Sequence, residues 1–134
     1  MKQTLLTICL IVFALSSWGE TLTMNDLVIR DNLYYKKFTN VPFTGEISGL
    51  ENGSFEKGKK NGPWENYHTN GQLWVKGNYK DGIRDGFWEA YFDDGQSMYK
   101  ANYKDGKPDG LEEMFDEDGN LTFTYEYKDG ELIE

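Results

Sequence analysis

The stretches NYKDGIRDG (residues 78–86) and NYKDGKPDG (residues 102–110) are almost identical and lie 24 positions apart. Extending the comparison outward aligns three consecutive blocks of 24 residues without gaps: 62–85, 86–109 and 110–133. A shorter copy, residues 45–61, precedes them and lacks seven residues in its middle. A fixed period of this length is typical of repeat architectures, in which each unit is stabilised by its neighbours.

Each block is predicted to form two short strands joined by a tight turn. In the first block, residues 63–68 form one strand, Asn70-Gly71 the turn and residues 73–79 the second strand. Asn-Gly and Asp-Gly pairs favour hairpin turns because both residues tolerate positive φ. The glycines predicted at the turns recur through all the units: Gly58, Gly62, Gly71, Gly82, Gly86, Gly95, Gly106, Gly110, Gly119 and Gly130.

The second strand of each block alternates between two kinds of side chain. In residues 73–79 the odd-numbered positions are apolar or aromatic apart from Gly77, and the even-numbered positions are polar apart from Trp74. Residues 97–103 follow a similar pattern, with Met98 as the exception on the polar side. Alternation with a period of two and one polar side is typical of a half-buried antiparallel sheet.

Aromatic residues also recur in register, and they are interpreted as structural ladders across the strands. The set is Phe55, Tyr67, Tyr79, Tyr91, Tyr103, Phe115 and Tyr127. Trp64 and Trp88 have the parity opposite to that of Tyr67 and Tyr91, so these two groups face opposite sides of the sheet unless a bulge intervenes.

These patterns predict an all-β fold: an elongated, single-layer antiparallel meander of stacked β-hairpins with roughly eight to ten strands. Residues 45–134 form the repeat domain, and residues 20–44 form an N-terminal hairpin and a lead-in segment. That hairpin is expected to turn near Asp31-Asn32, and Pro42 argues against a central strand after it. Stretches with a helical period are absent after residue 20.

Residues 1–19 are predicted to be a secretory signal peptide. A basic start, an apolar run of 11 residues (Leu5–Leu15) and small residues follow one another, and the run is too short to span a bilayer. Cleavage is expected between Gly19 and Glu20, with a cut after Ser16 or an uncleaved anchor as alternatives. The expected location is therefore exported, either periplasmic or extracellular.

The mature chain would contain no cysteine and be strongly acidic. Cys9 lies inside the apolar run, where the large side chain of Ile8 before it argues against a lipoprotein signal. Removing residues 1–19 removes only Lys2 among the charged residues, so the net charge changes from −9 to −10. This balance excludes nucleic acid as a partner and argues against strong membrane binding after signal cleavage. It favours a partner with a basic patch.

One recurring spacing resembles a known repeat. The pattern Tyr79-x-x-Gly82-x-x-x-Gly86-x-Trp88-x-x-Tyr91-x-x-x-Gly95 is similar to the bacterial variant of the MORN repeat. It recurs one unit earlier and one unit later, where Glu112 replaces the tryptophan, and the resemblance covers residues 45–134. It implies stacked hairpins with a binding or scaffolding role. Many relatives carry an antitoxin label attached by similarity, and the export signal departs from that picture.

Catalytic chemistry is not predicted. His68 is the single histidine, and no cysteine after residue 19 could join it in a nucleophile–base pair or a transition-metal site. Paired carboxylates occur at Asp93-Asp94, at Glu112-Glu113 and in residues 116–118, where turns and strand ends would leave them exposed. The protein is therefore expected to be a non-enzyme without catalytic residues, metal or cofactor.

Partner binding is the favoured function. Trp64, Trp74 and Trp88 are the candidate partner-binding residues, because a row of tryptophans on an exposed sheet face usually marks a contact surface. The alternative is that the N-terminal hairpin or a curl of the sheet covers them. The favoured role is a protein-interaction or scaffolding module of the bacterial envelope, acting through this row or a free sheet edge. A carbohydrate- or cell-wall-binding module that takes a glycan is the alternative, and an antitoxin-like inhibitor of a partner protein is a further one.

Overall fold

A computed structural model describes residues 21–133, so the predicted signal peptide with Cys9 lies outside the described residues. The described part contains a short 3₁₀ turn, Met24–Asp26, and twelve strands. The strands are β1 (Leu27–Arg30), β2 (Leu33–Lys36), β3 (Gly45–Ile47), β4 (Glu51–Glu56), β5 (Lys59–Tyr67), β6 (Leu73–Lys80), β7 (Ile83–Arg84), β8 (Gly86–Tyr91), β9 (Ser97–Lys104), β10 (Lys107–Phe115), β11 (Leu121–Lys128) and β12 (Glu131–Leu132).

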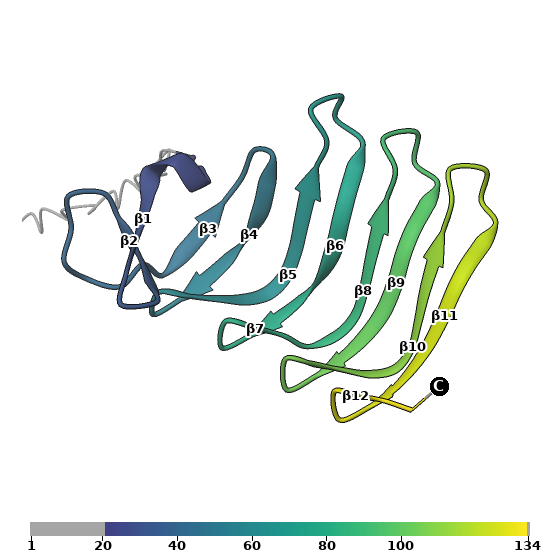
Figure 1. The fold of residues 1–134 in the computed structure, drawn as a ribbon. Helices are drawn as coiled ribbons and strands as arrows, with labels where there is room; N and C mark the ends of the chain where they lie inside the picture. The colour runs from purple at the N-terminus through teal and green to yellow at the C-terminus, as the bar shows by residue number, and fades with distance from the viewer. Residues whose placement is uncertain (1–20, 134) are drawn as a thin grey trace, which may run out of the picture.

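The strands form one long antiparallel meander and one separate hairpin. Strands β3 to β12 make a ten-stranded sheet in the order β12-β11-β10-β9-β8-β6-β5-β4-β3, with β7 paired to β6. The hairpins follow one another along the sheet from the N-terminal to the C-terminal end (Figure 1). The predicted all-β fold of stacked hairpins is confirmed.

Tight turns with positive φ connect the units, as Asp-Gly pairs favour. Asp81, Asp105 and Asp129 have φ of 50°, 51° and 49°, and each precedes a glycine that also has positive φ. The β1–β2 hairpin uses the same geometry at Asp31 and Asn32, with φ of 49° and 61°. Two successive residues with positive φ match the right-handed twist of the flanking strands.

Three of the predicted turn glycines are not in turns. Gly62 lies inside β5, Gly110 lies inside β10, and Gly86 begins β8. Their φ values are 94°, 106° and 79°. These positive φ values interrupt the pairing of the first strand of each unit, but the chain does not reverse its direction there. The first strands therefore extend further back than predicted, to Lys59 in β5 and to Lys107 in β10.

The two faces of the sheet differ in chemistry, and residues directly opposite each other on paired strands share a face. Trp64 lies opposite Gly77, and Trp88 lies opposite Ala101. We call the side that carries these indoles the tryptophan face. We call the other side the charged face; it carries Glu65, Lys76, Glu89, Lys100 and Glu113.

Bulges explain the two exceptions to the alternation in the second strands. The register shifts between Asn66 and Tyr67, and Trp74 is the extra residue on β6. Met98 and Thr122 are the extra residues at the matching shifts in β9 and β11. A bulge re-aims the side chain that it inserts, so these positions need not follow the period of two.

The N-terminal segment packs over one end of the tryptophan face. Leu27 of β1 joins Ile47, Phe55 and Trp64 in a buried cluster. Leu22, Met24, Tyr34 and Phe43 pack against the same cluster. The meander is therefore covered at its N-terminal end, and this cover does not include the C-terminal hairpins.

Candidate functional site

Trp64 and Trp88 are buried, which corrects the prediction that they form part of an exposed contact row. They are 2 % and 3 % exposed. Each indole lies on a glycine of the neighbouring strand: a Cβ built on Gly53 would stand 2.0 Å from Trp64, and one on Gly77 would stand 2.2 Å from Trp88. The absent side chain makes room for the ring, so these tryptophans belong to the core.

Aromatic rings join the units edge to face along the tryptophan face. The ring centroids of Phe55 and Trp64 are 5.3 Å apart, those of Trp64 and Tyr79 are 5.7 Å apart, and those of Tyr79 and Trp88 are 5.0 Å apart. The interplanar angles of 88°, 88° and 78° are favourable for aromatic pairs. Each unit thus contributes rings to a stack that its neighbour completes.

Trp74 is separate from the other two tryptophans. It occupies the bulge of β6, is 42 % exposed and lies near the His68 ring, with centroids 5.8 Å apart. His68 Nε2 is 2.9 Å from the carbonyl oxygen of Tyr91 in the next unit. The structure therefore brings no row of three tryptophans together, and of the three candidates only Trp74 remains accessible to a partner.

Basic side chains at equivalent positions cover the indoles. The Lys60 ammonium lies 4.0 Å from the Trp64 ring centroid. The Arg84 guanidinium lies 4.5 Å from the Trp88 centroid and donates a 3.0 Å hydrogen bond to the Tyr103 hydroxyl. Burial lowers the pKa of the Lys60 ammonium, and nearby Glu51 opposes this effect. Sequence reasoning missed this pair, although Lys60 and Arg84 are separated by one period.

The third unit replaces the indole by a carboxylate. Glu112 stands at the tryptophan position, and it lies opposite Ala101 where the earlier units have glycine. The Tyr99 hydroxyl donates a 3.0 Å hydrogen bond to Glu112 Oε2 and lies 3.1 Å from the Tyr103 hydroxyl. Burial raises the pKa of Tyr99, and Tyr103 and Glu112 raise it further. Both members of the indole–glycine pair therefore change together at the junction of the second and third units.

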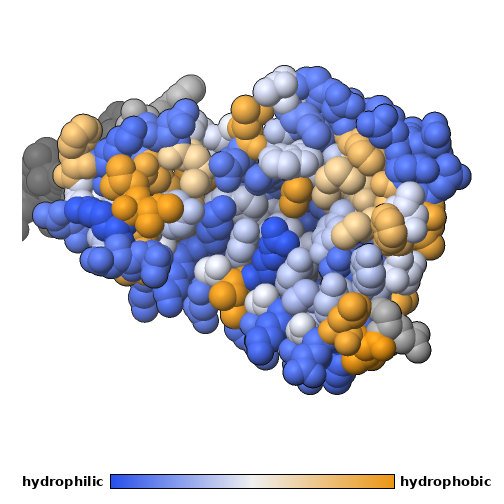
Figure 2. Space-filling model, in the orientation of Figure 1, coloured by the Kyte–Doolittle hydropathy of each residue, from blue (hydrophilic) through white to orange (hydrophobic). Residues whose placement is uncertain are grey.

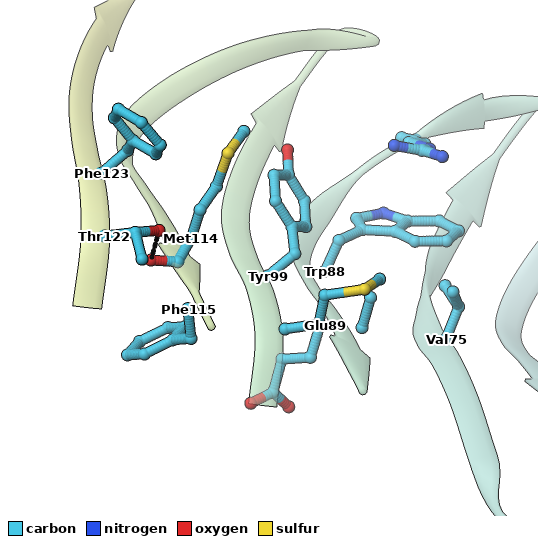
Figure 3. A pocket seen from close by; sticks show the side chains of 11 residues that line it. Val75, Trp88, Glu89, Tyr99, Met114, Phe115, Thr122 and Phe123 are labelled. Carbon is cyan, nitrogen blue, oxygen red and sulfur yellow. Dashed lines mark hydrogen bonds between the residues drawn. The ribbon is translucent and has the colours of Figure 1, made fainter. Parts of the chain in front are cut away.

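An open apolar groove lies beside this stack at the C-terminal half of the tryptophan face. A cross-strand row that passes from β6 to β11 forms its floor: Val75, Ala90, Tyr99, Met114 and Phe123. The groove has a volume of about 460 Å³, and Trp88 and Met98 also line it. In Figure 3 the side chains of Trp88, Tyr99, Met114 and Phe123 lie on one side of the strands, and the Glu89 carboxylate points away from them. We call this cavity the C-terminal groove.

One residue that lines the groove, Trp88, has a buried polar group without a partner. In the first unit the Trp64 indole Nε1 donates a 2.9 Å hydrogen bond to Asn66 Oδ1. Ala90 stands at the equivalent position of the next unit, and the buried Trp88 Nε1 has no acceptor among residues 21–133. A buried donor without an acceptor costs roughly 1–3 kcal/mol. One substitution in the repeat therefore both opens the groove and leaves this donor unsatisfied.

The family comparison agrees with the repeat geometry. A model of the MORN repeat variant matches residues 60–81, 84–105 and 108–129, three consecutive units. Three consecutive MORN repeats are thus present in this chain. The three matched units begin at Lys60, Arg84 and Pro108, which are equivalent positions of the repeat. In the first two units the basic residue at this position covers the indole. No curated protein matches the chain.

MORN repeats are generally modules that interact with proteins or membranes, which is compatible with a non-enzymatic protein.

An acidic side chain stabilises the last hairpin turn by accepting backbone hydrogen bonds. Asp116 Oδ1 accepts backbone N–H groups of Asp118 and Asn120 at 3.0 and 2.8 Å, and the hydrogen bond from Asn120 lowers the pKa of the Asp116 carboxyl. Within residues 21–133, no group of three or more metal-ligating side chains lies together. Over the same residues, none of the helices has the length and hydrophobicity needed to cross a membrane.

Proposed function

We propose that this protein is an exported, non-enzymatic interaction module of the bacterial envelope, and that the C-terminal groove binds a segment of a partner protein. The observation that carries the proposal is the unpaired indole N–H of Trp88 at an otherwise apolar cavity. A partner that places an apolar side chain over Ala90 would cover the cavity, and a local shift of the side chains above the buried Trp88 N–H would let a partner oxygen accept from it. Concave, mostly apolar sites with few polar groups are the usual form of binding sites.

The two ends of the tryptophan face support the same proposal. At the N-terminal end, Leu27 and its neighbours cover the aromatic stack, and Asn66 satisfies the indole of Trp64. At the C-terminal end, the N-terminal segment does not cover the groove beside Trp88, and residues 21–133 supply no acceptor for the Trp88 indole N–H. The partner would therefore cover the C-terminal half of the tryptophan face, as the N-terminal segment covers the N-terminal half.

The groove chemistry favours a protein over a glycan. Stacking on a sugar requires a free aromatic face, whereas Trp64 and Trp88 are enclosed by Lys60, Arg84 and neighbouring rings. Met98 and Met114 line the groove, and methionine adapts well to apolar partner side chains. An antitoxin-like inhibitor would be one particular case of such a partner-binding protein.

The substitution Ala90→Asn tests the proposal because the first unit already contains asparagine at this position. We expect the introduced amide to accept the Trp88 indole hydrogen bond, to narrow the groove at its floor and to stabilise the protein by about 1 kcal/mol. A photo-crosslinking residue at Met114 should capture one discrete protein in the exported fraction, and Ala90→Asn should abolish that capture. Phe87, exposed on the charged face, is the matched control position for the crosslinker.

Capture that is equal at Phe87 and Met114, or that survives Ala90→Asn, contradicts the proposed groove function. A glycan array supports the carbohydrate alternative if the protein binds a sugar and Ala90→Asn removes that binding. Export is tested separately by mass spectrometry of the protein from the periplasm or medium, which should begin at Glu20.

A further inference from the structure

Glu112 is the only buried charged side chain among residues 21–133, with 9 % of its surface exposed. Buried charges are usually paired with an opposite charge. Within this part of the chain Glu112 forms no ion pair, and its hydrogen-bond donor is the neutral hydroxyl of Tyr99. Lys128 of the flanking strand pairs with Asp109 instead, at 3.5 Å. The carboxylate of Glu112 therefore lacks a cation that the chain itself does not supply.

The other units show what the third unit has lost. In the first two units a basic side chain that begins the unit covers the indole on the tryptophan face. In the third unit Pro108 stands at the basic position, and Glu112 stands at the position of the indole. An aromatic ring with an internal cation is thus exchanged for a carboxylate without one. A cation supplied by another molecule would complete the third unit.

Four tyrosines surround Glu112 on the tryptophan face. Tyr125 lies directly opposite it on β11, and Tyr127 lies two residues further along the same strand. On the other side, β9 contributes Tyr99 and Tyr103, whose hydroxyl oxygens are 3.1 Å apart. Tyrosine rings attract cations through their faces, and the carboxylate adds an opposite charge. A guanidinium suits these surroundings, because it is planar, stacks on aromatic rings and donates hydrogen bonds to carboxylates.

Glu112 adjoins the C-terminal groove. It lies two residues before Met114, which belongs to the groove floor, so the two side chains share a face about 7 Å apart. An extended peptide presents every second side chain on one side with the same spacing. Figure 2 shows hydrophobic residues in small groups between hydrophilic ones, with one group at the C-terminal end of the sheet. A segment that combines an apolar and a charged side chain matches such a surface.

We propose that an arginine of the partner segment pairs with Glu112, two residues away from the apolar side chain that occupies the groove. The inference rests on the proposed function of the groove and adds the chemistry of the partner. The guanidinium donates charge-assisted hydrogen bonds to the Glu112 carboxylate and stacks on a tyrosine ring. The net charge of −9 favours the approach of a basic segment.

Entry of the guanidinium requires a local movement of the rings around Glu112, because so little of this side chain is exposed. Tyr125 and Tyr127 are half-buried, and within residues 21–133 β12 pairs only with the last two residues of β11. These rings therefore have more freedom to move than rings between two full units. Arg84 donates to the Tyr103 hydroxyl on the β9 side. The incoming cation thus approaches from the β11 side, away from the positive charge of Arg84.

Two short peptides probe the site without knowledge of the natural partner. Acetyl-Leu-Gly-Arg-amide and acetyl-Arg-Gly-Leu-amide carry the apolar and the basic side chain two residues apart, in either chain direction. Replacing arginine by citrulline keeps the size of the side chain and removes its charge. In NMR titrations of the purified protein, the arginine form of at least one peptide should bind roughly tenfold more tightly than its citrulline form.

Three variants separate the cation site from the groove. Glu112→Gln should abolish the preference for arginine, because it removes the buried charge and keeps the shape. Glu113→Gln removes the next carboxylate, which lies on the charged face, and should retain the preference. Ala90→Asn narrows the groove and should weaken the arginine and citrulline peptides alike.

Three results would each overturn the arginine site. They are equal binding of the arginine and citrulline peptides to the wild type, no measurable binding of the arginine peptides at millimolar concentration, and equal effects of Glu112→Gln and Glu113→Gln. The comparison with citrulline uses the unaltered protein, so it decides the matter even if a variant fails to fold. The groove function fails separately, when a residue at Met114 captures no protein although the preference for arginine is present.

Discussion

The indole of Trp88 lies on Gly77 of the neighbouring strand so closely that a Cβ at position 77 would stand 2.2 Å from the ring. Trp64 and Gly53 repeat the arrangement one unit earlier, where a Cβ at position 53 would stand 2.0 Å from the Trp64 ring. Each indole thus seats on the backbone of the unit before it. In a lone unit the indole lacks the glycine that it packs on, because that glycine belongs to the unit before, which explains in physical terms why the hairpins need one another.

Replacing the tryptophans by alanine should distinguish core from surface. Trp64→Ala and Trp88→Ala should each lower the free energy of unfolding by about 3–5 kcal/mol, because each empties a packed site. Trp74→Ala should change it by less than about 1 kcal/mol, since this ring is largely exposed. Urea denaturation measures all three values. Equal losses at the three positions would contradict the separation of Trp74 from the core.

Removing the Tyr99 hydroxyl should destabilise the third unit. Tyr99→Phe leaves the carboxylate of the buried Glu112 without its 3.0 Å hydrogen bond, at a cost of roughly 1–3 kcal/mol. Glu112→Gln retains an acceptor oxygen and should cost less. Tyr125→Phe keeps the Tyr99–Glu112 bond intact and is the matched control. If Tyr99→Phe and Tyr125→Phe behave alike in urea denaturation, the hydrogen bond contributes nothing measurable.

Acid should weaken the turn that Asp109 stabilises. The hydrogen bond from the Asp129 backbone N–H, with help from Lys128, lowers the pKa of the Asp109 carboxyl below 3.8. A carboxyl with a lowered folded-state pKa stabilises the protein above its unfolded pKa, and the contribution is lost as the pH falls through the folded value. The difference in Tm between wild type and Asp109→Asn should therefore shrink as the pH falls from about 7 to about 3. A difference that stays constant over this range argues against the assigned role of Asp109.

The repeat period and the turn residues were sufficient to predict the hairpins. Asp81-Gly82 and its equivalents dictate the tight turns locally, and the parity of Trp64 and Tyr67 separates the two faces. The burial of the tryptophans was not predictable from parity, because it depends on which residue of the neighbouring strand lies opposite. The signal was nevertheless present in the sequence, since Ala101 and Glu112 replace the glycine and the tryptophan together.

The C-terminal groove could not be predicted from the alternation alone. Met98 reaches it from a bulge, and a bulge shifts the direction of the side chain that it inserts. The cover at the N-terminal end depends on how Leu27 docks against Ile47 and Phe55, which is a long-range contact. Both features arise from tertiary packing, whereas the hairpins follow from local preference.

The substitution Gly77→Ala tests most directly whether the units are joined by indoles seated on glycine. Gly77 does not have positive φ, so strand preference alone would make alanine neutral or stabilising by about 0.5–1 kcal/mol. We predict instead that the added Cβ displaces the Trp88 ring and lowers the free energy of unfolding by about 1–3 kcal/mol in urea denaturation. An unchanged or increased free energy of unfolding would contradict the account.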